Sequence, residues 1–310
     1  MKGKNLVIIS LIIAILFPLF FLNKSFIIYL LTLALIYAIG AISFNLLLGI
    51  AGQLSLGHAA FMGIGAYTST LLVMKLNLPF LPSLIIAGIV SSLFGILIGF
   101  PSLRVSGFYL ALVTMAFGIA ITQIIGYLSF TGGYHGIKDI PPPEIFGLTL
   151  SSDLSKYYLA LIFLIVTIIL LTNLINSKTG RALKSLRENE ILASSLGINV
   201  SYYKILVFVI SAFFAGISGS LYAHTVSYIS PNDFGLGASL NFLAMIVIGG
   251  LGSVPGSILG AIFITIVPVF FARTSFSPYV FNGIMIILIM MLLPQGLIYL
   301  PNLFKKKASF

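Results

Sequence analysis

Charged side chains are scarce in this chain. Asp, Glu, Lys and Arg make up 7% of its 310 residues, and hydrophobic residues make up 59%. A soluble domain carries about 25% charged residues, so this composition cannot form a water-exposed surface. The apolar runs are continuous, whereas membrane β-barrels are built from short segments of alternating hydrophobicity. We therefore expect an all-α integral membrane protein, a polytopic helical bundle.

Cysteine is absent altogether. Its absence excludes disulfides, thiolate metal sites and cysteine nucleophiles, and it does not identify a compartment. His135 and His224 belong to no cluster of metal ligands in the sequence, so we expect no metal site. Catalytic carboxylates and histidines do not cluster either, so we expect no enzyme. The glycine-rich run at 249–256 lacks the Gly-Lys-Ser/Thr of a phosphate-binding loop, so we expect no nucleotide or other cofactor in this chain.

Long uncharged stretches cover most of the chain, and about 20 apolar residues are enough to cross a bilayer. Eight such stretches lie at 6–22, 26–49, 54–74, 82–101, 108–128, 157–176, 205–225 and 279–300. The first resembles a signal peptide but is too long for one and has no cleavage site, so we expect a retained helix. A further stretch at 239–272 contains GGLGSVPG (249–256), whose glycines and proline disfavour a continuous helix. Splitting it into two crossings or a re-entrant pair gives about ten membrane-crossing segments, with glycine-broken helices, in one domain (1–310).

The basic residues predict the orientation of the chain. With the N-terminus in the cytoplasm, the basic residues on the cytoplasmic side are Lys2, Lys4, Arg104, Lys178, Arg181, Lys184, Arg187, Lys204, Lys305, Lys306 and Lys307. Those on the outer side are Lys24, Lys75, Lys138, Lys156 and Arg273. This excess follows the positive-inside rule, which also explains the net charge of +10 without a nucleic-acid partner. We expect a multi-pass protein of the cell membrane with both termini in the cytoplasm, a cytoplasmic segment at 177–204 and an outer loop at 129–156.

The cytoplasmic segment 177–204 is the most highly charged part of the chain. Arg181, Lys184 and Arg187 share one face of a helix because they follow one another at three-residue spacing. That basic face suits anionic lipid headgroups, and it equally suits a protein partner.

A second short helix is expected after Asn189, whose side chain can cap it. Glu190 would then lie at the positive end of the helix, and Gly197 would end it. The residues that this helix would present are Ala193, Ser194, Ser195 and Leu196. Small side chains of this kind let a helix sit deep in a groove of another protein.

The position of the charges bears on the energy source. All sixteen basic and six acidic residues lie outside the predicted crossings. Ion-coupled carriers usually keep an ionisable group within the membrane, although sodium coupling through backbone carbonyls is an alternative. We therefore expect energy to come from outside the bilayer.

The stretch GQLSLGHAAFMGIGAY (52–67) combines polar side chains with glycines. Its singled-out residues are Gln53, Ser55, Gly57, His58, Gly63 and Gly65. They either line a pathway along a broken helix or let helices pack closely, and packing is the commoner role of such glycines. We expect His58 to be a hydrogen-bonded structural group. Gly249, Gly250 and Gly252 allow the same two interpretations, and we expect Gly216 and Gly219 to serve packing.

Three stretches resemble segments of one protein family. GRALKSLRENEILASSLGINVSYYKILVFVISAFFAGISGSLYA (180–223) resembles the ATPase-coupling region of importer permeases, in which Glu190, Ala193 and Gly197 match a loose Glu-Ala-Ala…Gly signature. FNLLLGIAGQLSLGHAAFMGIGAY (44–67) and LNFLAMIVIGGLGSVPGSILGAIF (240–263) resemble the glycine-rich segments of the same family. The family is that of branched-chain amino acid permeases from ATP-binding-cassette (ABC) importers, in its LivM-like branch. The second alanine of the signature is not obvious here.

This resemblance implies a permease subunit that moves branched-chain or other hydrophobic amino acids into the cytoplasm. It implies a second, similar permease subunit, two cytoplasmic ATPase subunits that bind the ATP, an extracytoplasmic solute-binding protein, and surrounding membrane lipid. Contact with the ATPases would fall on Asn189, Glu190, Ala193, Ser194, Leu196 and Gly197. A urea, amide or nucleoside importer permease is an alternative on the same scaffold, and a stand-alone channel or ion-coupled carrier is a more distant one.

Overall fold

The computed structural model describes residues 17–18, 24–145, 147–271, 283, 287, 291 and 296–299. The predicted crossing at 6–22, most of that at 279–300 and the basic cluster 305–307 lie outside these residues. The main helices are α2 (Ser25–Asn45), α3 (His58–Leu76), α4 (Phe80–Gly99), α5 (Gly107–Tyr127), α6 (Asp153–Asn176), α7 (Lys178–Glu188), α8 (Glu190–Ser195), α9 (Val200–Val226), α10 (Leu236–Gly249) and α11 (Val254–Phe271). A π-helix (Leu46–Ile50) continues α2, and short 3₁₀ turns lie at Pro101–Leu103, Ser129–Thr131, Gly133–His135, Pro231–Phe234 and Leu297–Tyr299.

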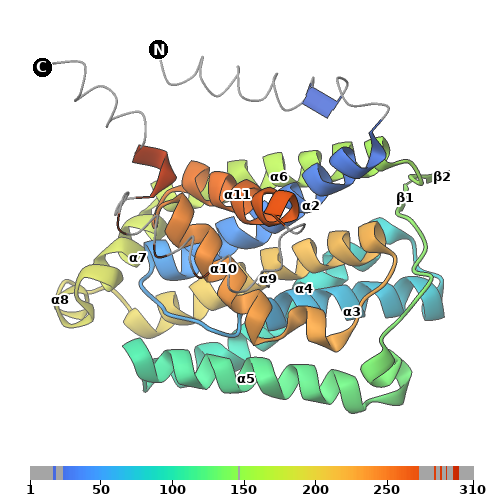
Figure 1. Ribbon diagram of the computed structural model, residues 1–310. Helices are drawn as coiled ribbons and strands as arrows, with labels where there is room; N and C mark the ends of the chain where they lie inside the picture. The colour runs from blue at the N-terminus through green and yellow to red at the C-terminus, as the bar shows by residue number, and fades with distance from the viewer. Residues whose placement is uncertain are drawn as a thin grey trace, which may run out of the picture.

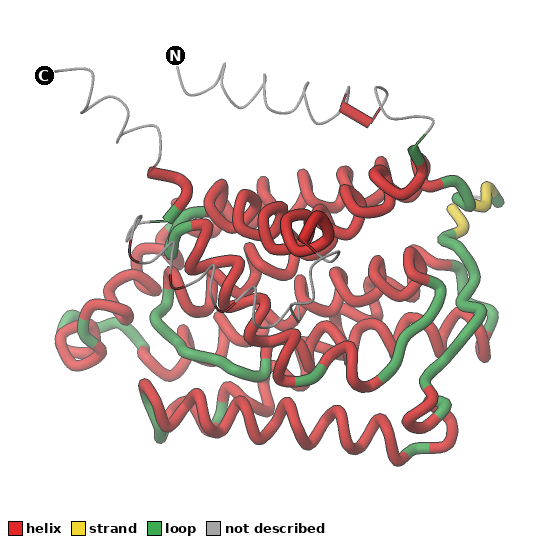
Figure 2. Tube along the Cα trace, in the orientation of Figure 1, coloured by secondary structure: helices red, strands yellow, loops and turns green. Residues whose placement is uncertain are grey.

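Seven helices of the described part are long and apolar enough to cross a membrane. They correspond to the stretches predicted between residues 26 and 249, and a shorter apolar helix, Val254–Val269, follows them. The molecule is therefore an all-α, polytopic membrane bundle, as the composition predicts (Figure 2). The total of about ten crossings stays a prediction, because two of them fall mainly outside the described residues.

The predicted break in 239–272 is confirmed. Helix α10 ends at Gly249, and α11 begins at Val254. Gly250 and Gly252 between them have φ angles of +122° and +81°, which residues with a Cβ rarely adopt. Pro255 does not lie in the break but in the first turn of α11, where its missing N–H leaves no helical bond unmade.

Helix α9 lies at the centre of the bundle and packs against α3, α4 and α2. Glycines permit this close approach. A Cβ built on Gly65 would overlap the backbone of Gly216, and one on Gly219 would overlap the carbonyl of Met62. The packing role expected for Gly216 and Gly219 is therefore realised within this chain, at the crossing of α9 with α3 and α4.

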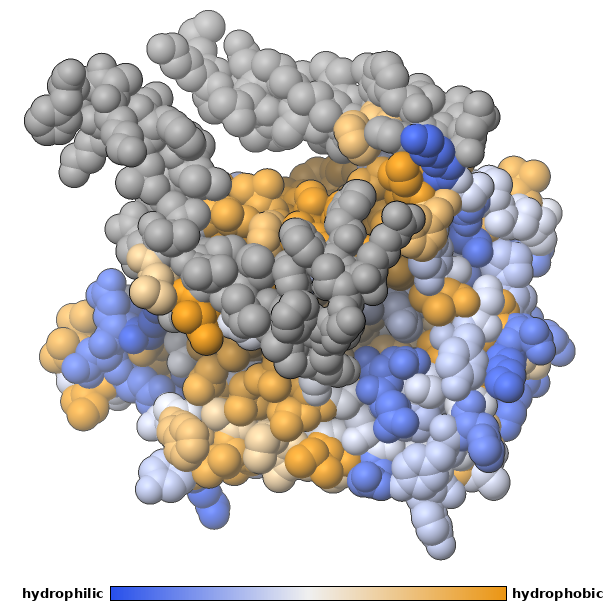
Figure 3. Space-filling model, in the orientation of Figure 1, coloured by the Kyte–Doolittle hydropathy of each residue, from blue (hydrophilic) through white to orange (hydrophobic). Residues whose placement is uncertain are grey.

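The two ends of the bundle carry different segments, as Figure 1 shows. At one end, Ile137 and Ile229 exchange backbone hydrogen bonds of 2.9 and 3.1 Å, which joins the 129–156 loop to the turn after α9. This loop also holds the two-stranded hairpin of β1 (Glu144–Ile145) and β2 (Leu148–Thr149). Helices α7 and α8 lie at the opposite end. The visible hydrophilic residues gather toward these ends, and hydrophobic ones lie between them (Figure 3).

Charged residues enter the ends of the helices, although they lie outside the predicted crossings. Five charged residues lie inside helical segments long enough to cross a membrane: Lys75, Asp153, Lys156, Lys204 and Asp233. All five lie within the first two turns or the last turn, because capping extends the helices beyond the uncharged stretches. Helix α9 begins at Val200 instead of 205 because the Asn199 side chain accepts the N–H of Tyr202 at 3.0 Å. The central turns of these segments still carry no Asp, Glu, Lys or Arg.

Candidate functional site

Helix α7 opens the polar segment between α6 and α9. The hydroxyl of Ser177 caps it by accepting the N–H of Thr179 at 3.1 Å. Leu183 and Leu186 are buried against the bundle, while Arg181 and Lys184 are exposed on the other side. The amphipathic pattern thus fixes α7 at the end of the bundle with two of its predicted basic residues turned outward.

Helix α8 has the caps that the sequence predicts. The Asn189 side chain accepts the N–H groups of Ile191 and Leu192 at 2.9 and 3.0 Å. At the other end, the N–H of Gly197 donates to the carbonyl of Ser194 at 2.9 Å. The N–H of Ile198 donates to the carbonyl of Ala193 at 3.1 Å. These two bonds form a Schellman motif, and Gly197 occupies its left-handed position with φ +83°.

The surface of α8 differs from the expected one. Ala193 is buried against the bundle and is not presented to a partner, which corrects the prediction for this residue. The exposed apolar side chains are Ile191, Leu192 and Leu196, with exposed fractions of 78%, 62% and 81%. Ser194 is exposed as expected. The side of α8 that faces away from the bundle is therefore an apolar surface of large side chains.

Glu190 has a second role besides its place at the start of α8. Its carboxylate lies 2.8 Å from Nζ of Lys204, which is almost completely buried near the start of α9. The same Nζ donates to the carbonyl of Ser102, between α4 and α5, at 3.1 Å. A buried lysine is costly without partners, and these two compensate it. The ion pair therefore ties α8 to α9 and to the α4–α5 connection.

Arg187 departs from the basic face predicted for α7. Its guanidinium donates to the carbonyl of Gly49, in the π-helix that continues α2. It also lies beside Gly252, in the break between α10 and α11. Arg187 is an exposed residue, but its guanidinium reaches back to the bundle, whereas Arg181 and Lys184 of the predicted trio face outward toward lipid headgroups.

Asn45, the last residue of α2, was not singled out from the sequence. It is buried, and its amide nitrogen donates to the carbonyl of Ser253 at 2.9 Å and to Oγ of Ser257 at 2.8 Å. Its oxygen accepts the N–H of Gly252 at 2.8 Å. Asn45 therefore joins the end of α2 to the break before α11. An uncharged polar residue inside an apolar stretch, four residues before Gly49, was the available signal.

His58 begins α3 and is completely buried. Its Nε2 lies 3.1 Å from Oγ of Ser43 and 3.2 Å from the carbonyl of Gly40, and its ring stacks on Phe44. The expectation of a hydrogen-bonded structural group fits this geometry. In the described part of the chain, no three residues of the types His, Cys, Asp and Glu come together as a possible metal site.

The other singled-out residues of 52–67 divide into two groups. Gly57 lies against the carbonyl of Thr114, and Gly63 lies against the ring of Phe234, so these glycines serve packing. The polar atoms Oε1 of Gln53, Oγ of Ser55 and Nδ1 of His58 are buried without a hydrogen-bond partner in the described part. Each unmade bond of this kind costs about 1–3 kcal/mol, and a buried water is the usual partner of such a group.

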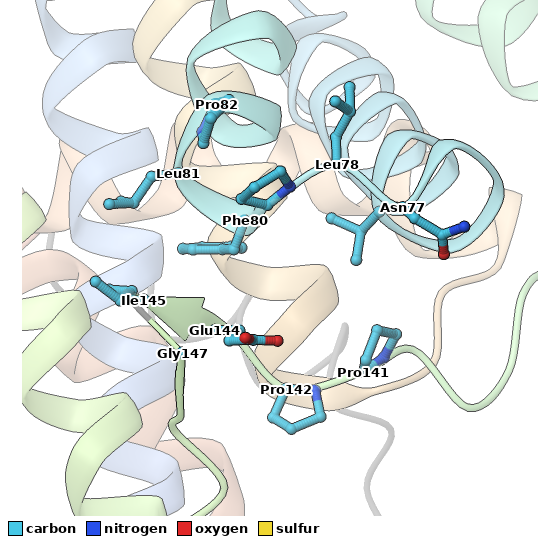
Figure 4. Close-up of a pocket in the computed structure, with 12 residues that line it drawn as sticks. Asn77, Leu78, Phe80, Leu81, Pro82, Pro141, Pro142, Glu144, Ile145 and Gly147 are labelled. Atoms are coloured by element: carbon cyan, nitrogen blue, oxygen red, sulfur yellow. The ribbon is translucent and has the colours of Figure 1, made fainter.

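A hollow opens at the end of the bundle opposite α8 (Figure 4). Its volume is about 660 Å³, and it lies between the α3–α4 turn and the 129–156 loop. Apolar side chains, including Phe80, Pro141 and Pro142, form most of its wall, and Glu144 supplies a carboxylate. The rest of the wall comes from Val73, Asn77, Leu78, Pro79, Leu81, Pro82, Ile145 and Gly147.

Comparison with known proteins gives a consistent result. The family described as branched-chain amino acid transport system / permease component matches residues 26–293. The high-affinity branched-chain amino acid transport system permease protein LivM of Salmonella typhimurium and that of Escherichia coli are each 34% identical to the chain. Each alignment covers 96% of this chain and 75% of the relative.

A second kind of relative is more distant. The permease protein LivH of the Escherichia coli high-affinity branched-chain amino acid transport system is 28% identical, over 88% of this chain and 94% of its own length. No solved structure matches the chain. The match to the family covers the bundle from α2 onward, including α7, α8 and the break between α10 and α11, and this protein therefore belongs to the family of branched-chain amino acid transport system permease components.

Proposed function

We propose that this chain is a membrane-spanning permease subunit of an ABC importer, which moves branched-chain or other hydrophobic amino acids into the cytoplasm. The relatives named LivM and LivH are permease proteins of such amino acid transport systems. A partner permease of the same family completes the pathway, two ATPase subunits supply the energy, and a solute-binding protein delivers the amino acid. The chain itself carries out no covalent chemistry and leaves ATP to its partners.

The observation that carries this proposal is the apolar surface of α8. Ile191, Leu192 and Leu196 project from the end of the bundle on a helix that is capped at both ends. Exposed apolar side chains on a polar segment suit a protein or membrane contact, and the resemblance of this segment to an ATPase-coupling region favours the ATPases. The ATPases would bind here, so that α7 and α8 face the cytoplasm and the termini lie on the same side.

Movement of α8 would enter the bundle through the ion pair of Glu190 with Lys204. Lys204 belongs to α9, the helix at the centre of the bundle, and it also holds the carbonyl of Ser102. Displacing α8 therefore pulls on α9 and on the α4–α5 connection together. Alternating access requires that the ATPases bind one arrangement of these helices better than the other.

The opposite end of the bundle would face the solute-binding protein. It carries the 129–156 loop and the hollow that includes Phe80 and Glu144. A pathway along 52–67 would involve Gln53 and Ser55, whose buried side-chain oxygens lack a hydrogen-bond partner in the described part of the chain.

Replacing Gly197 with valine is expected to uncouple transport from ATP hydrolysis, so that less solute is taken up for each ATP hydrolysed. The valine would have to adopt φ +83°, and left-handed backbone costs a residue with a Cβ about 1–2 kcal/mol. No neighbour lies within 4 Å of a built Cβ, so the effect comes from the backbone alone. Uptake per ATP hydrolysed by the reconstituted complex should fall severalfold.

Gly197→Asn is the matched control, because asparagine tolerates the left-handed region and adds a side chain of similar size. It should keep most of the coupling. Equal coupling in the valine and asparagine variants and in the unmodified complex would show that the end of α8 does not transmit the movement.

A further inference from the structure

We infer that Arg187 is a positioning residue through which movement of α7 and α8 reaches two glycine-containing breaks in the helices at once. The two breaks are residues 49–52, after α2, and residues 250–253, between α10 and α11. This inference rests on the proposed function, because the movement originates in the ATPases. It adds a route that is separate from the ion pair of Glu190 with Lys204.

The first observation is the free carbonyl that Arg187 meets. The π-helix ends in a turn where the backbone N–H of Gln53 donates to the carbonyl of Leu47 at 3.0 Å and not to the carbonyl of Gly49. The carbonyl of Gly49 is therefore available at the negative end of a helix, where a cation is favoured. The guanidinium of Arg187 donates to it. This charge-assisted bond joins the last turn of α7 to the end of α2.

The second observation is that the two breaks are in contact. A Cβ built on Gly49 would lie 2.5 Å from the amide nitrogen of Gly252, so only glycine permits this approach. One built on Gly52 would lie 3.0 Å from Cγ of Arg187, and one on Gly252 would lie 3.6 Å from a guanidinium nitrogen of the same residue. The side chain of Arg187 thus lies against both breaks.

The third observation is that hydrogen bonds join the end of α2 to the second break independently of Arg187. The side chain of Asn45 bonds the N–H of Gly252 and the carbonyl of Ser253. The end of α2, which leads into the first break, is thereby tied to the second break, and Arg187 ties both to α7. Displacement of α7 must either break the bond to Gly49 or shift the ends of α2, α10 and α11 together.

The alternative role for Arg187 is that of one more headgroup contact on α7. Arg181 provides the comparison, because it lies on the same helix, carries the same charge and, like Arg187, is an exposed residue. The two differ in that the guanidinium of Arg187 bonds the carbonyl of Gly49. If Arg187 only contacts headgroups, Arg187→Ala and Arg181→Ala should have the same effect on hydrogen exchange and on uptake per ATP hydrolysed. If Arg187 positions the breaks, only Arg187→Ala should change these quantities. Arg187→Lys should then have an intermediate effect, because an ammonium lacks the planar fork of the guanidinium.

The test uses the full complex of both permeases, the ATPases and the binding protein in nanodiscs and proteoliposomes. Hydrogen exchange is measured on peptides that cover 46–56 and 248–256. Arg187→Ala should raise exchange about tenfold in both, the factor expected from losing one charge-assisted hydrogen bond. Arg181→Ala should leave it unchanged. Uptake of labelled leucine per ATP hydrolysed should fall by a similar factor in Arg187→Ala only.

Several outcomes decide between the possibilities. Equal exchange in both breaks for Arg187→Ala and the unmodified complex would overturn the inference, and so would an equal loss of coupling in Arg181→Ala. Retained folding is checked with Arg187→Lys, which should elute as an intact complex and show an intermediate ratio of uptake to hydrolysis. An unmodified complex without ATP-dependent uptake would instead overturn the proposed function, and with it the coupling role of Arg187.

Discussion

Replacing Asn45 with leucine is expected to destabilise the protein by about 3 kcal/mol. The side chain of Asn45 makes three hydrogen bonds, to Gly252, Ser253 and Ser257, and leucine of similar size makes none of them. A buried group left without its partner costs about 1–3 kcal/mol, and the N–H of Gly252 would be left so. Thermal unfolding of the purified chain in detergent, followed by size-exclusion chromatography, measures the effect.

Asn173→Leu is the control for this substitution, since Asn173 is an exposed residue of α6. Its unfolding temperature should match that of the unmodified protein. An unfolding temperature for Asn45→Leu that equals the control would mean that Asn45 does not hold α2 to the break before α11.

Replacing Gly65 with valine is expected to prevent normal packing of α3 against α9, at a cost of about 3 kcal/mol or more. A Cβ at this position would overlap the carbonyl and Cα of Gly216. These are backbone atoms of the central helix, so the overlap cannot be relieved by rotating a side chain. Overpacking a tight core typically costs about 1–3 kcal/mol, and backbone overlap lies at the upper end. The yield of monodisperse protein and its unfolding temperature should both fall.

Ala120→Val adds a branched side chain to an exposed position of α5 and is the matched control. It should leave yield and unfolding temperature unchanged. A Gly65→Val protein that is as stable as Ala120→Val would contradict the close crossing of α3 and α9.

The features that sequence could predict are those set by neighbouring residues. The cap of Asn189, the left-handed Gly197 and the break before α11 all follow from residue types within a few positions. The apolar helices follow from continuous runs long enough to cross a bilayer. Each of these depends on local chemistry and needs no knowledge of the packing.

The features that sequence could not predict depend on contacts between distant segments. Lys204 lies inside α9 because Glu190 and the carbonyl of Ser102 compensate its burial. Ala193 is buried because of the side on which α8 packs, which its own sequence does not determine. The glycine breaks at 49–52 and 250–253 fall at comparable places in the sequence, but only the fold brings them into contact and places Arg187 on both.

The central claim is that this chain transports only when ATPases drive it. The most direct measurement is uptake of labelled leucine into proteoliposomes that contain either the purified chain alone or the complete complex with binding protein and internal ATP. The account predicts ATP-dependent uptake by the complex and none by the chain alone under proton or sodium gradients. Uptake by the chain alone, at a rate comparable to the complex, would contradict it.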